Sequence, residues 1–138
     1  MIPRLLVGIC LLVLVTSCSQ APEALPADVN VIVDLKEYTI TLNTPTVKAG
    51  VVKIGIRNMG TMVHDFDLIK TDLALDKLPI DGASAQAKTD GLVKQMTNIA
   101  QGRVTTLEAS LAAGHYVIIC NVAGHYQLGM RAELTVQQ

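Results

Sequence analysis

Apolar and polar side chains alternate along most of the chain after residue 28. The alternating runs cover residues 29–35, 38–42, 52–56, 105–111 and 132–136, with glycine, proline and asparagine between them. A period of two residues places the apolar side chains on one face of an extended strand. Several short runs of this kind predict half-buried antiparallel strands in one all-β domain, either a Greek-key sandwich or a barrel.

Two stretches are less regular. Residues 64–70 are predicted to form a strand, whereas residues 71–102 form the longest break in the alternation. Apolar residues within this insertion recur at intervals typical of one helix face, and a glycine follows them: Leu92, Val93, Met96, Ile99, Ala100 and Gly102. We therefore predict one short helix over residues 91–100.

The first residues have the features of a secretory signal peptide, namely Arg4, an apolar run over 5–15 and small residues before Cys18. The run from Val15 to Cys18 also resembles a bacterial lipobox, in which cleavage precedes the cysteine and diacylglycerol is attached to its sulfur. We therefore predict a signal peptide over 1–17, a lipidated Cys18 with a flexible tether over 18–28, and a folded domain over 29–138. The alternatives are an ordinary signal peptide with an incidental cysteine, or an uncleaved anchor, which the shortness of the apolar run disfavours. The prediction places the protein on a membrane, facing the periplasm or the cell exterior.

Export leaves the folded domain with a single cysteine. Cys10 would be removed with the signal peptide and Cys18 would carry lipid, so only Cys120 remains and no internal disulfide can form. A lone thiol in an oxidising compartment needs an explanation. It is either a buried structural residue or a metal ligand.

Charge and size exclude some functions. Removal of Arg4 with the signal peptide leaves 10 basic and 12 acidic residues, which is a net charge of about −2. This charge argues against nucleic-acid binding, because such binding needs a strongly basic face. The mature chain of about 120 residues is long enough for one domain with its own core. We expect a monomer that does not bind nucleic acid, with a core made mostly of aliphatic side chains because aromatic residues make up only 3% of the chain.

A possible metal centre lies near the C-terminus. Cys120, His125 and Met130 follow an apolar stretch at intervals of five residues, and His64 lies far upstream. Taken singly, each of these residues is more often structural than functional. Together they supply a thiolate, two imidazoles and a thioether, which is the ligand set of a blue-copper site. Gly124 and Gly129 allow the chain to turn before the second and third of these side chains.

Two segments resemble the cupredoxins, the family of plastocyanin, azurin and amicyanin. Residues 58–66 look like the family's Asn-x5-His segment, and residues 114–130 are similar to its Gly-x-Tyr-x-x-x-Cys strand and ligand loop. The resemblance covers residues 29–137. The loop and the insertion after Lys70 look most like those of sulfocyanin and its bacterial relatives, while auracyanin has the same ligand spacing. The resemblance implies a cupredoxin-like sandwich with one type 1 copper.

The resemblance also implies supporting residues around the copper. Asn58 occupies the asparagine position of the first motif. Many relatives have asparagine after the first histidine, linking the two ligand segments, whereas this chain has Asp65. We expect the Asp65 carboxylate to accept a hydrogen bond from the loop near Asn121 and to lower the reduction potential through its charge.

An apolar surface is expected around the exposed edge of His125. Its residues come from both ligand segments: Met59, Met62, Val122, Ala123, Tyr126 and Leu128. Exposed apolar patches often mark docking surfaces. His115 lies on the strand before Cys120 with the opposite parity, and we expect it to face solvent away from the metal.

Cupredoxins of this type carry single electrons, and the resemblance implies the same function here. Hydrolase patterns such as Gly-x-Ser-x-Gly and His-Glu-x-x-His are absent from the sequence. We therefore predict a non-enzymatic carrier whose partner is a cytochrome, a quinol-oxidising complex or a terminal oxidase. A lipoprotein that sequesters or delivers copper is the alternative, and a purely structural β-sandwich is a third possibility.

Overall fold

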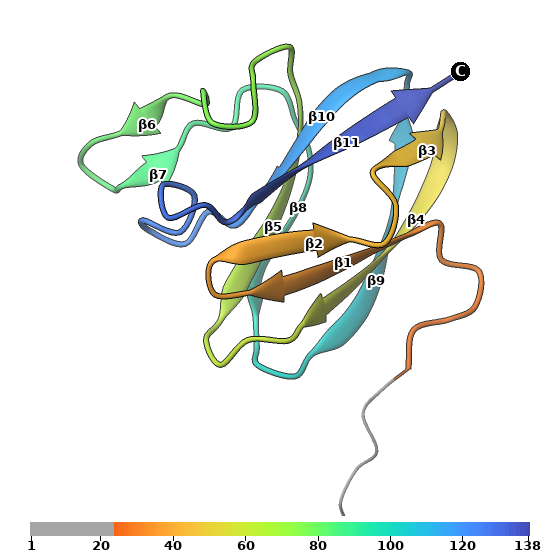
Figure 1. Cartoon of the computed structure of the whole chain (residues 1–138), viewed down its shortest axis with the longest axis horizontal. Coiled ribbons are helices and arrows are strands. Elements are labelled where there is room, and N and C mark those ends of the chain that lie inside the picture. The colour runs from red at the N-terminus through yellow and green to blue at the C-terminus, as the bar shows by residue number, and fades with distance from the viewer. Residues whose placement is uncertain (1–23) are drawn as a thin grey trace, which may run out of the picture.

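The computed structural model describes residues 24–138, which form two β-sheets packed face to face and a separate small hairpin (Figure 1). The four-stranded sheet has the order β2-β1-β4-β9, with β1 at Val31–Lys36, β2 at Thr39–Leu42, β4 at Gly50–Asn58 and β9 at Val104–Leu111. The five-stranded sheet has the order β3-β11-β10-β5-β8, with β3 at Thr46–Lys48, β11 at Arg131–Gln137, β10 at Gly114–Ile119, β5 at His64–Lys70 and β8 at Leu92–Ile99. The hairpin pairs β6 (Ile80–Asp81) with β7 (Gln86–Ala87). The predicted all-β sandwich is confirmed.

The strand pairing is mixed. We predicted antiparallel strands, and most pairs are antiparallel, but β1 pairs with β4 and β3 pairs with β11 in parallel. Alternation along a strand reports which face is buried and carries no information about the direction of the neighbouring strand. The sequence pattern could therefore predict the strands without predicting these two pairings.

The predicted signal peptide over 1–17, the lipidated Cys18 and the first part of the tether lie outside the described residues. The last part of the tether contacts the domain, because the half-buried Leu25 packs over Gly55 of β4. A Cβ atom at Gly55 would lie only 2.8 Å from the methyl groups of Leu25. Immediately before Leu25, Ala24 lines a hollow of about 520 Å³ together with Met59, Gly60 and Gly102.

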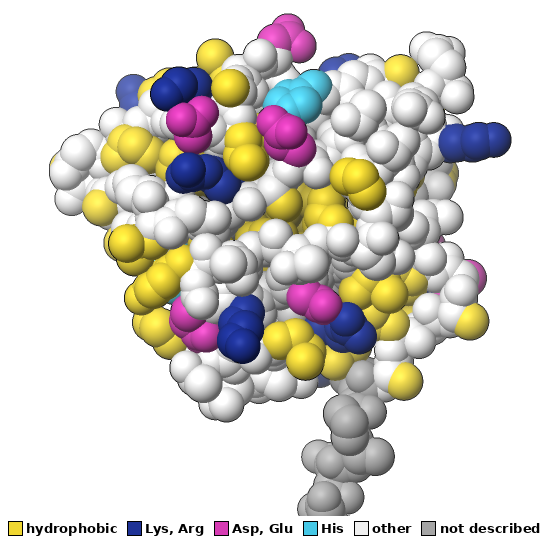
Figure 2. All heavy atoms as spheres, viewed as in Figure 1, with side chains coloured by type: hydrophobic (Ala, Val, Ile, Leu, Met, Phe, Trp, Pro, Cys, Tyr) yellow, Lys and Arg dark blue, Asp and Glu magenta, His cyan; other side chains and the backbone are white. Residues whose placement is uncertain are grey.

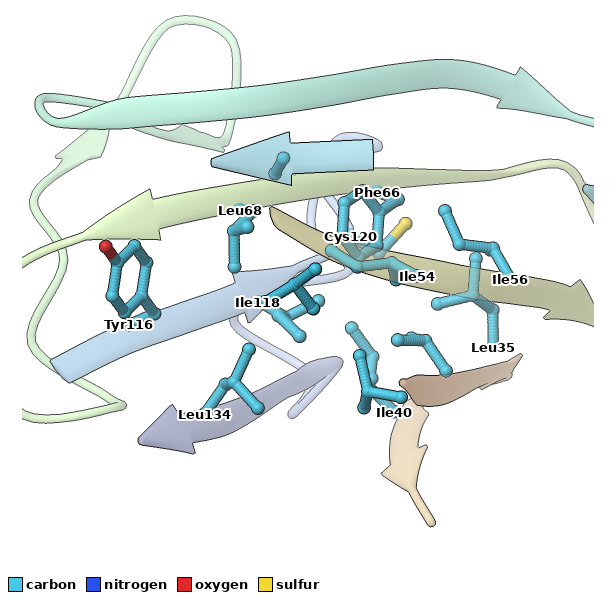
Figure 3. Packing of buried hydrophobic residues seen from close by; sticks show 14 of the residues in the cluster. Leu35, Ile40, Ile54, Ile56, Phe66, Leu68, Tyr116, Ile118, Cys120 and Leu134 are labelled. Atoms are coloured by element: carbon cyan, nitrogen blue, oxygen red, sulfur yellow. The ribbon is translucent and has the colours of Figure 1, made fainter. Parts of the chain in front are cut away.

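The core between the two sheets is mainly aliphatic, as the composition predicts. Fully buried side chains meet there from both sheets, and Cys120 lies among them beside Phe66 (Figure 3). A second apolar cluster covers the outer face of the five-stranded sheet. It joins Ile69, Val117 and Ile119 to residues of the insertion and the ligand loop, namely Leu75, Leu78, Ala87 and Tyr126. Strand β10 is therefore buried on both faces, which explains its unbroken apolar run from Tyr116 to Ile119.

The helix predicted over residues 91–100 is wrong, because residues 92–99 form strand β8. Val93, Met96 and Ile99 face the core at intervals of three, since β8 carries an extra residue at each of two irregularities in its pairing with β5. Asn98 adopts a positive φ of 56° at one of them. Bulges of this kind change the two-residue period of a strand, and here they imitate a helical period. None of residues 24–138 is helical, so no helix in this range is long and apolar enough to cross a membrane.

Asp67 is a buried carboxylate on β5. It is 0% exposed, and among the described residues neither of its oxygens has a hydrogen-bond partner of good geometry, although the amides of Gln95 and Asn121 lie near it. Burial raises the pKa of Asp67 to about 6 from an ordinary value of 3.8, and the negative charge of Asp65 makes a smaller contribution in the same direction. The folded state therefore favours the neutral carboxyl group.

We predict that Asp67→Asn stabilises the protein at pH 8 but not at pH 4. Because the folded pKa is raised, the wild-type protein loses stability as the pH rises from about 4 to above 6, by about 3 kcal/mol for about two pKa units. Urea unfolding at both pH values measures this difference. Substitution of the exposed Asp72 by Asn is the control, and an Asp67→Asn effect that is the same at both pH values would contradict the prediction.

Candidate metal centre

Three predicted ligands converge at one end of the sandwich. His64 begins β5, Cys120 directly follows β10, and β5 and β10 are neighbours in the same sheet. Nδ1 of His64 lies 3.7 Å from Sγ of Cys120, and Nδ1 of His125 lies 3.4 Å from the same sulfur. One donor atom from each of the three residues lies within 4.8 Å of the other two.

The loop over residues 120–130 is held by its own backbone. The N–H of Cys120 donates to the carbonyl of Met130 at 3.0 Å, and the N–H of Met130 donates to the carbonyl of His125 at 3.0 Å. Gly124 and Gly129 have positive φ values of 81° and 109°, so the predicted turns require glycine or strain. The loop returns Met130 to the core cluster that contains Cys120, where its side chain is fully buried.

The donor atoms are spaced as a shared metal ion requires. With the bond lengths that zinc shows to the same donor types, about 2.3 Å to sulfur and about 2.0 Å to nitrogen, and an angle of about 120°, a bound ion separates the two donors by about 3.7 Å. The observed separations of 3.7 and 3.4 Å are close to this value. His64, Cys120, His125 and Met130 therefore form a site compatible with a type 1 copper.

Burial controls the electrostatics of the donors. It is the main factor that raises the pKa of the Cys120 thiol, while the backbone N–H groups of Asp65 and Val122 lower it. Burial also lowers the pKa of His125, and the charge of a protonated His64 would lower it further. The protein alone thus favours a neutral thiol and a neutral His125 imidazole, so a metal cation is needed to stabilise the thiolate.

Asn58 and Asp65 fix the two ends of the segment that carries His64. The Asn58 amide is buried and donates to the carbonyl groups of Met62 and Ile99 at 2.7 and 2.8 Å, and its oxygen accepts the N–H of Gly60 at 2.9 Å. The backbone N–H of Asp65 donates to Sγ of Cys120 at 3.2 Å. Both residues support the geometry of the donors.

The expected link from Asp65 to the loop near Asn121 is replaced by other contacts. The Asp65 carboxylate accepts the backbone N–H of Asn98 at 2.9 Å, in the irregular part of β8. The Asn121 side chain instead exchanges two hydrogen bonds with the backbone of Ala87, at 2.8 and 3.1 Å. Asn121, the residue directly after Cys120, is therefore hydrogen-bonded to the β6–β7 hairpin. The sequence could not show this because the hairpin is a separate insertion.

Glu37 is a site residue that the sequence analysis missed. It lies in the turn between β1 and β2, and its Oε1 is 3.2 Å from Nε2 of His64. Hydrogen bonds to the carboxylate lower the pKa of Glu37 to about 2. The largest contribution comes from the backbone N–H of Glu37 itself, and smaller ones come from the N–H groups of Met62 and Thr61. No spacing in the sequence relates Glu37 to His64, because the two residues come from different sheets.

The predicted apolar surface is present in part. Met59, Met62 and Leu128 are exposed, and Tyr38 lies edge-on to His125 with ring centroids 5.1 Å apart. Figure 2 shows hydrophobic side chains gathered at the lower left of the view, where Figure 1 places the β1–β2 turn and the loop before β5. Val122 is half-buried against the core.

Tyr126 does not belong to this surface, contrary to the prediction. Its side chain is 3% exposed, and its hydroxyl accepts the N–H of Leu78 at 3.0 Å and donates to the carbonyl of Leu75 at 2.9 Å. The insertion therefore covers Tyr126. His115 is half-exposed on the outer face, as expected, with Nδ1 2.7 Å from the Thr71 carbonyl oxygen and Nε2 3.5 Å from Glu133.

Comparisons with known proteins agree with this fold. No family model matches the chain, and no curated protein matches it. Among solved structures, auracyanin from Roseiflexus castenholzii is 20% identical with a TM-score of 0.59, over 78% of this chain and 95% of that one. Rusticyanin from Thiobacillus ferrooxidans is 18% identical with a TM-score of 0.59, over 78% and 75%.

A third solved structure is auracyanin A from Chloroflexus aurantiacus, which is described as a "blue" copper protein. It is 22% identical to this chain with a TM-score of 0.55, over 77% of this chain and 96% of that one. Identities this low show the likeness of the fold alone. The fold that this chain shares with auracyanin and rusticyanin is the cupredoxin fold.

Proposed function

We propose that this protein carries single electrons through one type 1 copper ion held by His64, Cys120 and His125, with Met130 as the axial ligand. The observation that carries the proposal is the convergence of three buried donor atoms within 4.8 Å of one another, from two distant segments. Copper, when bound, supplies a one-electron couple between its Cu(I) and Cu(II) states. Soft sulfur donors beside imidazole favour copper over the harder divalent cations.

The residues around the donors suit a carrier. His64, Cys120 and Met130 are fully buried and His125 is 4% exposed, so the protein shields the centre from water. The hydrogen bonds within the 120–130 loop hold the donors in one arrangement, so little rearrangement is needed when an electron arrives or leaves. This closed arrangement offers no open position for a substrate and supports a carrier rather than an enzyme.

The exposed apolar surface supports docking of a redox partner. Met59, Met62 and Leu128, together with Tyr38 against the His125 ring, make this end of the domain apolar. An apolar patch around the least buried ligand gives a partner close access to the metal without opening the site. We propose that a cytochrome, a quinol-oxidising complex or a terminal oxidase docks there.

Copper handling is the second candidate function. The observation in its favour is the exposure of two thioethers, Met59 and Met62, on the loop before His64, at 59% and 44%. The complete burial of Cys120 favours the carrier, because delivery needs ligands that exchange readily. Weak colour with rapid transfer of Cu(I) to an acceptor would support the handler, whereas intense colour with tight retention of copper would support the carrier.

We predict that the copper-loaded domain has an intense visible absorption and that Cys120→Ala abolishes it. The colour of such a site depends on the thiolate, and no other cysteine lies in residues 24–138. Optical and electron paramagnetic resonance spectra with metal analysis measure this. His115→Ala is the control and should leave the spectra unchanged. Intense colour in Cys120→Ala would refute the assignment of the ligand.

We predict that Met130→Leu still binds copper but has a higher reduction potential. The leucine side chain fills a similar volume and offers no lone pair, so axial donation to the oxidised ion is lost. Potentiometric titration of the two proteins measures the change. An unchanged potential in a variant that keeps its colour would show that Met130 only fills the core.

We also propose that the protein is exported and anchored through lipid on Cys18, which the lipobox-like run before it supports. We predict that Cys18→Ser moves the protein from the membrane fraction to the soluble fraction. Fractionation of cells that express each form, with mass spectrometry of the mature N-terminus, measures this. A wild-type mature N-terminus that does not begin at Cys18, or that lacks the mass of diacylglycerol, would contradict the lipid anchor.

A further inference from the structure

The turn between the first two strands brings a carboxylate to one of the proposed ligands. Glu37 extends from the four-stranded sheet, whereas His64 begins a strand of the five-stranded sheet. Oε1 of Glu37 lies 3.2 Å from Nε2 of His64, and this ring nitrogen faces away from Cys120. The His64 side chain is fully buried and the Glu37 side chain is 18% exposed, so water screens this contact only weakly.

The Glu37 carboxylate has a fixed position. The same Oε1 accepts the backbone N–H groups of Thr61 and Met62, each at 2.7 Å. Gly60 makes room for it, because a Cβ atom at that position would fall 2.5 Å from Oε1. The loop before His64 is therefore built around this carboxylate, and the turn cannot move without disturbing the loop.

An ionised carboxylate selects one form of a neutral histidine. It can only accept hydrogen bonds, so the proton of His64 must lie on Nε2 and the lone pair on Nδ1. Nδ1 is the nitrogen that lies 3.7 Å from Sγ of Cys120. The contact thus orients the ring with its free lone pair toward the space between the donors.

We infer that Glu37 is a positioning residue for the metal centre, which presents the lone pair of His64 to the copper and lowers the reduction potential through its negative charge. The inference rests on the proposed copper site. The electrostatic direction follows from Coulomb's law, because an anion stabilises the doubly charged oxidised ion more than the singly charged reduced ion. Residues outside the ligand set that fix a histidine in this way commonly affect metal affinity as well.

Glu37→Gln tests the role of the charge, because glutamine keeps an oxygen that can accept the same hydrogen bonds. The expected result is a protein that still binds one copper, with a higher reduction potential and a weaker affinity for Cu(II), because the charge is lost while the hydrogen bonds to Thr61, Met62 and His64 are kept. Glu133→Gln is the matched control, since Glu133 also contacts a histidine, the half-exposed His115. Its potential and copper affinity should remain close to those of the wild type.

A second measurement needs neither copper nor a variant. Nitrogen-15 NMR of the copper-free wild-type protein, recorded at a pH at which the His64 ring carries a single proton, reports which ring nitrogen holds that proton, and Nε2 is expected. A proton on Nδ1 would overturn the inference, as would an unchanged potential in copper-loaded Glu37→Gln or an equal rise in Glu133→Gln. Failure of the wild-type protein to bind copper would instead refute the proposed function, and the NMR result would still decide whether Glu37 sets the form of His64.

Discussion

The pairing of β5 with β10 is the constraint on which the metal centre depends. His64 begins β5 and Cys120 follows the last residue of β10, so their antiparallel pairing places the imidazole and the thiol at the same end of one sheet. Apolar clusters on both faces of β10 hold that strand in place. The same burial opposes ionisation of the Cys120 thiol. A bound cation would offset this cost and stabilise the thiolate.

Much of the fold and the donor set was predictable because both are recorded locally in the sequence. Alternation reports the buried face of each strand, and Cys120, His125 and Met130 lie on one short loop at regular spacing. His64 could be related to them through a motif of its own. Strand β8 shows the limit of this approach, because extra residues in its pairing produced a three-residue interval that resembled a helix. The partner strand determines that irregularity, and periodicity within one strand does not contain it.

The supporting contacts were less predictable because they join distant elements. Glu37 reaches His64 across the two sheets, Asn121 bonds to the β6–β7 hairpin, and Tyr126 is covered by the insertion. The sequence around Tyr126 does not show which distant segment covers its side chain. The insertion therefore has a structural role at the centre, since it is bonded to the residues that follow Cys120 and His125 along the chain.

The position of Ala24 has a consequence for how far the domain can stand from a bilayer. Ala24 shares a hollow with Met59, which belongs to the exposed apolar surface. Six peptide steps connect Cys18 to Ala24, and a fully extended chain of that length spans at most about 20 Å. If Cys18 carries lipid, the exposed apolar surface lies next to the tether and stays close to the lipid headgroups. Encounters with partners embedded in the same bilayer then become a search in two dimensions rather than three.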